Sequence, residues 1–128
     1  MCDHTSIYTN HYQGMTYRFG VAYLRSVGDE YRESEDVKAQ ILDAQRATVA
    51  VKAIAQRCIV VKEFIESDVS LPLFDRPGFC RLMAFVRERQ PSMLFLNQLQ
   101  HQISDEDWMV LVEVLEDYNV WVYRSGAF

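Results

Sequence analysis

The chain has 128 residues, of which 49% are hydrophobic and 24% are charged, and its formal net charge is −5. This length supports one domain with one core, and the balance is that of a globular chain rather than a disordered or fibrous one. The negative charge argues against a domain that grips nucleic acid unaided, because phosphate binding needs clustered lysine and arginine.

Residues 1 to about 16 predict an irregular N-terminal leader. The stretch "MCDHTSIYTNHYQGMT" has no hydrophobic period. Cys2, His4 and His11 lack an established ligand spacing, so a mobile tail is favoured over a metal site. The stretch has no signal-peptide core, and no apolar run reaches the length of about 18 to 20 residues that spans a bilayer. We therefore expect a cytoplasmic protein that uses no metal or other cofactor.

From Tyr17 onward, segments typical of strands alternate with segments typical of helices. We expect strands at 17–24, 58–65, 92–97 and 119–123, and helices at 34–57, 76–90 and 104–118. Ser34 and Ser104, each followed by acids, and Pro77 in a first turn are helix-start signals. The alternation predicts an α/β domain over 17–128, with a mainly parallel four-stranded sheet covered on both faces.

The apolar residues of these segments predict the core. Helical spacing gives the first helix a buried face made of Val37, Ile41, Ala44, Val49, Ala53 and Ile54. The large aromatic residues expected in the core are Phe95, Trp108 and Trp121. Cys58 and Cys80 lie among apolar residues and are expected to be buried thiols, since three widely separated cysteines do not form a disulfide framework.

Three loops are expected at one edge of the sheet, where parallel sheets bind ligands. These are the loops 25–30, 66–76 and 97–104. Arg25 and Ser26 leave the first strand, and Arg76 precedes the second helix, so two guanidinium groups beside a hydroxyl would suit a phosphodiester. The alternative is a pair of structural arginines bonded to carbonyls or nearby acids. His101 is expected to be a solvated loop residue rather than a general base, and the acids 105–107 to be helix-start charges.

These loops resemble the catalytic domain of the serine recombinases, the resolvase and invertase family. "VAYLRS" is similar to the family's opening strand, which ends in an arginine and then the catalytic serine. "ESDVSLPLFDRPGFCRLM" is similar to its second strand exit and the Asp-Arg-Pro-Gly helix start, with Arg76 as the arginine, and Gln45 fits its first helix. The resemblance covers about 19–123 and implies a resolvase-like three-layer αβα fold with the first strand central. In active members it implies a serine that attacks DNA.

The sequence departs from the family at the chemically important positions. The family serine stands two positions after the arginine, where this chain has Val27, and Ser26 occupies the apolar position between them. Neighbouring strand side chains point to opposite faces, so this displacement turns the hydroxyl away. After the third strand the family has Asp-Arg-Leu-x-Arg, but this chain reads Leu96-Asn97-Gln98-Leu99-Gln100-His101. The chain also ends at Phe128, before the family's long dimerisation helix and DNA-binding module.

Three functions remain open from the sequence. The first is a catalytically inactive serine-recombinase-like domain that works as a homo-oligomer or on a protein partner, in DNA recombination or in a mobile element, with DNA binding weak. The second is an active or partner-activated recombinase subunit that uses Ser26. The third is a small-anion or nucleotide-binding module built on Arg25 and Arg76. The apolar run "WMVLVEVLEDYNVWVY" favours association, because large exposed apolar patches mark contact surfaces.

Overall fold

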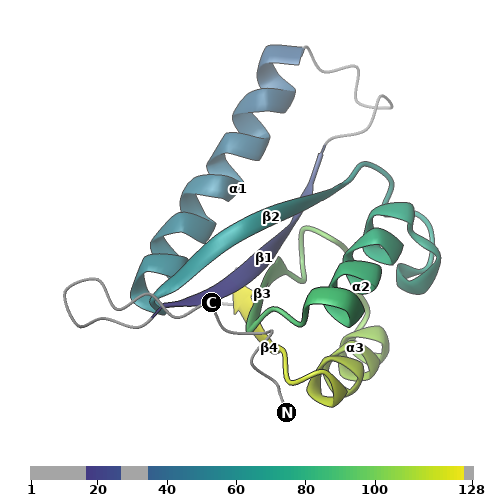
Figure 1. Cartoon of the computed structure of the whole chain (residues 1–128). Helices are drawn as coiled ribbons and strands as arrows, with labels where there is room; N and C mark the ends of the chain where they lie inside the picture. The colour runs from purple at the N-terminus through teal and green to yellow at the C-terminus, as the bar shows by residue number, and fades with distance from the viewer. Residues whose placement is uncertain (1–16, 27–34, 126–128) are drawn as a thin grey trace.

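A computed structural model describes residues 17–26 and 35–125 of the chain (Figure 1). The strands are β1 (Arg18–Arg25), β2 (Cys58–Glu66), β3 (Met93–Asn97) and β4 (Trp121–Ser125), and the helices are α1 (Glu35–Ala55), α2 (Pro77–Arg89) and α3 (Asp105–Asp117). A short 3-10 turn, η4 (Leu73–Asp75), precedes α2. The predicted leader, Val27 and Ser34 lie outside the described residues.

The four strands form one sheet in the order β2-β1-β3-β4, and every neighbouring pair is parallel. This confirms the predicted parallel sheet and the interior position of the first strand. Residues 19–24 of β1 are all buried, as expected of a strand with a neighbour on each side and a helix layer over each face. The carboxyl ends of β1, β2 and β3 therefore lie along one edge of the sheet, where their loops begin.

Helices cover both faces of the sheet, which confirms the three-layer αβα fold (Figure 1). Alternate residues of β1 separate the two halves of the core, because successive strand side chains point to opposite faces. Val21 and Tyr23 pack in the cluster that includes residues of α2 and α3. Ala22 and Leu24 pack in the smaller cluster on the α1 side. Within the described residues, no helix is long and apolar enough to cross a membrane.

Helix α1 buries part of the face that was predicted for it. Its buried residues are Gln45, Val49 and Ala53. Val49 and Ala53 confirm part of the prediction, but Ala44 is exposed and Ile54 is 78% exposed. The prediction was wrong for Ala44 and Ile54 because apolar residues lie on both sides of this helix, so periodicity alone does not say which of them meet the sheet.

Two further core predictions were wrong, while the helix-start predictions on described residues were right. Cys58 is buried, but Cys80 is exposed on α2. Phe95 is fully buried, whereas Trp121 is 67% exposed because β4 is an edge strand. Pro77 is the first residue of α2, and the Ser104 side chain accepts a hydrogen bond from the backbone N–H of Asp107 at 3.1 Å.

The position of β3 inside the sheet makes Leu94 a sensitive test of this core. Leu94 is 0% exposed in the larger cluster, so Leu94→Ala should lower the free energy of unfolding by about 2–5 kcal/mol through lost burial and the cavity left behind. Urea unfolding followed by circular dichroism measures this. Met109→Ala on α3 is the matched control: this side chain is 67% exposed, and its loss should change stability by less than about 0.5 kcal/mol. Equal losses in the two variants would contradict the fold.

Candidate functional site at the carboxyl edge of the sheet

The Arg76 guanidinium joins two of the three loops at the carboxyl edge. Arg76 is 3% exposed and stands directly before α2. Its Nε and Nη2 donate to the carbonyls of Leu71 at 2.8 Å and Val69 at 2.9 Å, within its own loop. Its Nη1 donates to the carbonyl of His101 at 2.7 Å, in the loop that follows β3. The side chain therefore serves the backbone of both loops, as the structural alternative predicted.

Arg25 makes a second link between loops, at the end of β1. Its Nη1 donates to the Gln100 carbonyl at 2.9 Å, while its Nε is buried and makes no hydrogen bond. The two arginines thus reach adjacent carbonyls of one loop, those of Gln100 and His101. The prediction that Arg25 and the loops 66–76 and 97–104 meet at one edge is confirmed, and the two arginines join them. Residues 27–30 of the first predicted loop lie outside the described residues.

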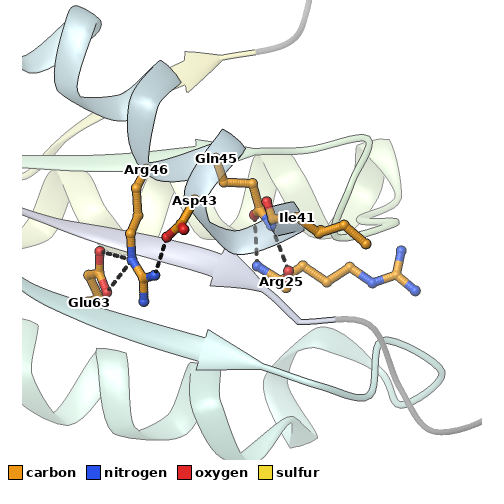
Figure 2. A network of polar contacts seen from close by, with 6 residues as sticks. All are labelled: Arg25, Ile41, Asp43, Gln45, Arg46 and Glu63. Atoms are coloured by element: carbon orange, nitrogen blue, oxygen red, sulfur yellow. Dashed lines mark hydrogen bonds and ion pairs between the residues drawn. The ribbon is translucent and has the colours of Figure 1, made fainter. Parts of the chain in front are cut away.

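The backbone of Arg25 is fixed by a side chain from α1. Gln45 accepts a hydrogen bond from the Arg25 N–H through Oε1 at 2.9 Å and donates to the Arg25 carbonyl through Nε2 at 2.6 Å (Figure 2). Its Nε2 also lies 3.3 Å from the Ile41 carbonyl. The Gln45 amide therefore binds both backbone polar groups of the last residue of β1. Ser26 follows at once, and its N–H donates to the Glu66 carbonyl at 2.8 Å.

The loop after β3 is closed by the side chains of Asn97 and Gln98. The Asn97 Oδ1 accepts a hydrogen bond from the Gln100 N–H at 2.9 Å. The Gln98 Nε2 donates to the Ile103 carbonyl at 3.0 Å and to the Asp105 carboxylate at 3.2 Å. Gln98 is 3% exposed, and its Oε1 is buried without a hydrogen bond. Both amides therefore shape the loop from inside.

His101 lies in the centre of this arrangement, and the expectation that it is solvated was wrong. It is 0% exposed and stacks on the Tyr23 ring, with 4.1 Å between ring centroids. Its Nε2 lies 3.0 Å from the Tyr23 carbonyl. A carbonyl only accepts, so Nε2 carries the proton and Nδ1, which is buried without a partner, does not. Burial, helped by the nearby Arg76 and Arg25 charges, lowers the pKa of His101 to about 4.

Sequence reasoning missed Glu66, the last residue of β2. Its buried carboxylate accepts hydrogen bonds from the Tyr23 hydroxyl at 2.5 Å and from the backbone N–H groups of Gly78 at 3.0 Å and Phe79 at 2.8 Å. Gly78 is required here, because a Cβ at that position would lie 2.7 Å from Glu66 Oε1. Burial and the Glu66 contact raise the pKa of the Tyr23 hydroxyl. The sequence signal that could have identified Glu66 is an acidic residue at the end of a strand, followed along the chain by a Pro-Gly helix start.

A shallow cleft of about 140 Å³ lies between α1 and the strand ends. Its polar lining consists of Gln45, Thr48, Asn97 and Gln100, with Tyr23 and apolar residues around them. Among the described residues that line it there is no charged side chain. The Arg25 and Arg76 side chains bond to backbone carbonyls of the fold and do not line the cleft. The cleft presents the side-chain amides of Gln45, Asn97 and Gln100 and the Thr48 hydroxyl.

The comparison with protein families agrees with this arrangement. A model of the family described as the resolvase N-terminal domain matches residues 21–124, which run from within β1 to within β4 and include β2, β3 and the three helices. The chain belongs to this family. A comparison with curated proteins gives no significant match for this resolvase-family domain.

Solved structures of serine recombinases share the fold of this resolvase-family domain. The N-terminal catalytic domain of TP901-1 integrase is 17% identical, with a TM-score of 0.66 over 84% of this chain and 77% of that one. A resolvase family site-specific recombinase from Streptococcus pneumoniae is 16% identical, with a TM-score of 0.58 over 84% of this chain and 72% of that one. The C-terminal catalytic domain of ISC1926 TnpA, an IS607-like serine recombinase, is 16% identical, with a TM-score of 0.58. The match covers 80% of this chain and 65% of that one, so this chain spans slightly less than two thirds of that domain.

Removing the Glu66 carboxylate tests its role at the start of α2. Glu66→Ala leaves two backbone N–H groups and one hydroxyl without their acceptor, so we expect the free energy of unfolding to fall by about 3 kcal/mol or more. Urea unfolding measures this. Glu63→Ala is the matched control on the same strand: it removes only the partly exposed pair with Arg46, which contributes about 0–1 kcal/mol. A Glu66 variant as stable as the control would contradict the role.

The His101 environment predicts a pH dependence of stability. The pKa is about 6.5 in the unfolded chain and about 4 in the folded chain, so the unfolded chain binds more protons between these values. The free energy of unfolding should therefore fall as pH is lowered from about 6.5 to about 4, by about 3 kcal/mol from this group. Urea unfolding at pH 7.5 and 4.5 measures the loss. His101→Gln should show a smaller loss than the wild type, and an equal loss would contradict the assignment.

Proposed function

We propose that this chain is a resolvase-fold domain that does not cleave DNA and acts through protein contacts, in DNA recombination or its regulation within a mobile element. One observation carries the proposal: the polar side chains at the carboxyl edge make hydrogen bonds that hold the domain's own backbone. Arg25, Arg76, Asn97, Gln98 and His101 all do this. An edge built in this way supports the loops and leaves little to offer a phosphodiester.

The hydrogen bonds and the burial of Arg76 support the proposal that this edge does not bind a scissile phosphate. Three of the five N–H donors of Arg76 are used by carbonyls, and the residue is 3% exposed. A buried guanidinium that is satisfied by carbonyl dipoles loses those bonds if it turns to an outside anion, and leaving buried carbonyls unpaired costs about 1–3 kcal/mol each. Clamping a scissile phosphate would therefore disrupt the loop structure that positions the clamp.

The uncharged residues after β3 support the same conclusion. The family motif that follows the third strand contains two arginines, whereas the corresponding segment of this chain has Gln98 and His101 and no arginine. Losing one preorganised donor to a transition state costs about 2.7–4 kcal/mol, so two losses account for a rate reduction of roughly 10⁴-fold or more. With Val27 in the family's serine position there is also no nucleophilic atom two residues after Arg25.

The other two functions predict different behaviour. An active or partner-activated recombinase would use Ser26, whose backbone is bonded to the end of β2. A small-anion or nucleotide-binding module would use Arg25 and Arg76, but the neighbouring cleft is lined by neutral groups. One experiment distinguishes these two functions from the proposed one.

Incubation with DNA tests the proposal directly. Supercoiled plasmid should remain uncut, with no covalent protein–DNA product, and sedimentation velocity at low salt with a short duplex should show self-association that DNA does not change. Ser26→Ala should behave as the wild type does, because the hydroxyl has no catalytic role.

Two results would overturn this function. Nicking or a covalent adduct that disappears in Ser26→Ala would identify an active recombinase subunit. A duplex-dependent or phosphate-dependent shift that is lost in Arg25→Ala would identify an anion site. Arg46→Ala is the matched control for charge, because this arginine lies on α1 and pairs with Asp43 and Glu63 (Figure 2).

A further inference from the structure

The exposed face of α1, on the side away from the sheet, is apolar over residues 47–55. In a monomeric domain such an exposed helix face is usually polar. From Ala47 to Ala55, every exposed residue is alanine, threonine, valine or isoleucine. Val51 is 67% exposed and Ile54 is 78% exposed. The only charged residue in this range, Lys52, is half-buried with its Nζ 5.7 Å from the Tyr123 ring centroid. A helix that is apolar on both faces is normally buried on both.

Four of these residues form one stripe on the side away from the sheet. Ala47, Ala50, Val51 and Ile54 are spaced at i, i+3, i+4 and i+7, which places them on one helical face. The residues that meet the sheet, Gln45, Val49 and Ala53, lie on the opposite side. The stripe therefore points away from the sheet.

From this stripe we infer that α1 is the contact between two copies of this chain, packed antiparallel about a two-fold axis that passes between Ala50 and Val51. This arrangement places Ile54 of each copy against Ala47 of the other, and Val51 against Ala50. Each large side chain then meets a small one, which lets the helix axes approach to about 8–10 Å. A two-fold contact of this kind uses the same surface on both copies and closes at two. The inference deepens the proposed function, because it identifies the partner and the surface.

Charge supports a second copy and the antiparallel direction. The chain carries a net charge of −5, so two copies repel each other least where an uncharged surface meets its like. The stripe is bounded by Asp43 at its N-terminal end and by Arg57 just after its C-terminal end, both exposed. Antiparallel packing brings Asp43 of one copy toward Arg57 of the other at both ends, whereas parallel packing would bring like charges together.

Sedimentation equilibrium of the full chain tests the inference. The wild type should dimerise, and Ile54→Glu should raise the dissociation constant by roughly 100-fold or more, since the change places two buried charges in a symmetric contact. Met109→Glu, on exposed α3, is the matched control and should leave the dimer unchanged. Circular dichroism should show that both variants keep the fold, because both side chains are exposed.

A charge-swapped mixture tests the predicted register. Ala47→Lys alone should also weaken the dimer, but mixing it with Ile54→Glu should restore association, because position 47 of one copy then pairs with position 54 of the other. A monomeric wild type, an Ile54→Glu variant that dimerises like the wild type, or a mixture that stays monomeric would each overturn the inference. Strand cleavage by a dimer that passes these tests would overturn the proposed inactivity alone, so the two failures are distinguishable.

Discussion

The carboxyl edge of this domain depends on one buried cation. The Arg76 guanidinium reaches carbonyls in its own loop and in the loop after β3, two segments about 25 residues apart in the chain. A buried charge is tolerated only where hydrogen bonds replace water, and here the backbone provides them. The positions of His101, of Gln100 and of the Arg25 side chain follow from this contact, because all three belong to or contact the same loop.

Around this cation, His101 and Glu66 stabilise the edge through contacts with neighbouring strands and helices. His101 is neutral because it is stacked on Tyr23 without access to water and lies near two arginines. The Glu66 carboxyl oxygens accept hydrogen bonds from the start of α2 and from the Tyr23 hydroxyl. Similar components in a catalytic edge would face a substrate. Here they face the backbone, which is the physical basis for proposing a domain that binds proteins and does not cleave DNA.

Two surfaces of the domain then have different characters. The carboxyl edge is polar and internally bonded, whereas the outer face of α1 is apolar and has exposed Val51 and Ile54. Burial of such a face in a symmetric contact removes apolar area from water twice per dimer. This contrast between the two surfaces is the physical basis for proposing that the domain assembles with a second copy and does not cleave DNA.

The sequence by itself determined the order of elements, the parallel sheet and the family, because hydrophobic period, helix caps and the stretch around Arg76 are local signals. The sequence also predicted that Arg25 and Arg76 lie at one edge of the sheet. Only the tertiary structure showed that their guanidinium groups donate hydrogen bonds to backbone carbonyls. Ile54 and Trp121 are apolar yet exposed, and His101 is polar yet buried, because exposure depends on which elements pack nearby and not on residue type. The hydrogen-bond partners of Glu66 are 12 to 43 residues away in the chain, so its position before a Pro-Gly helix start indicates a role but does not identify those partners.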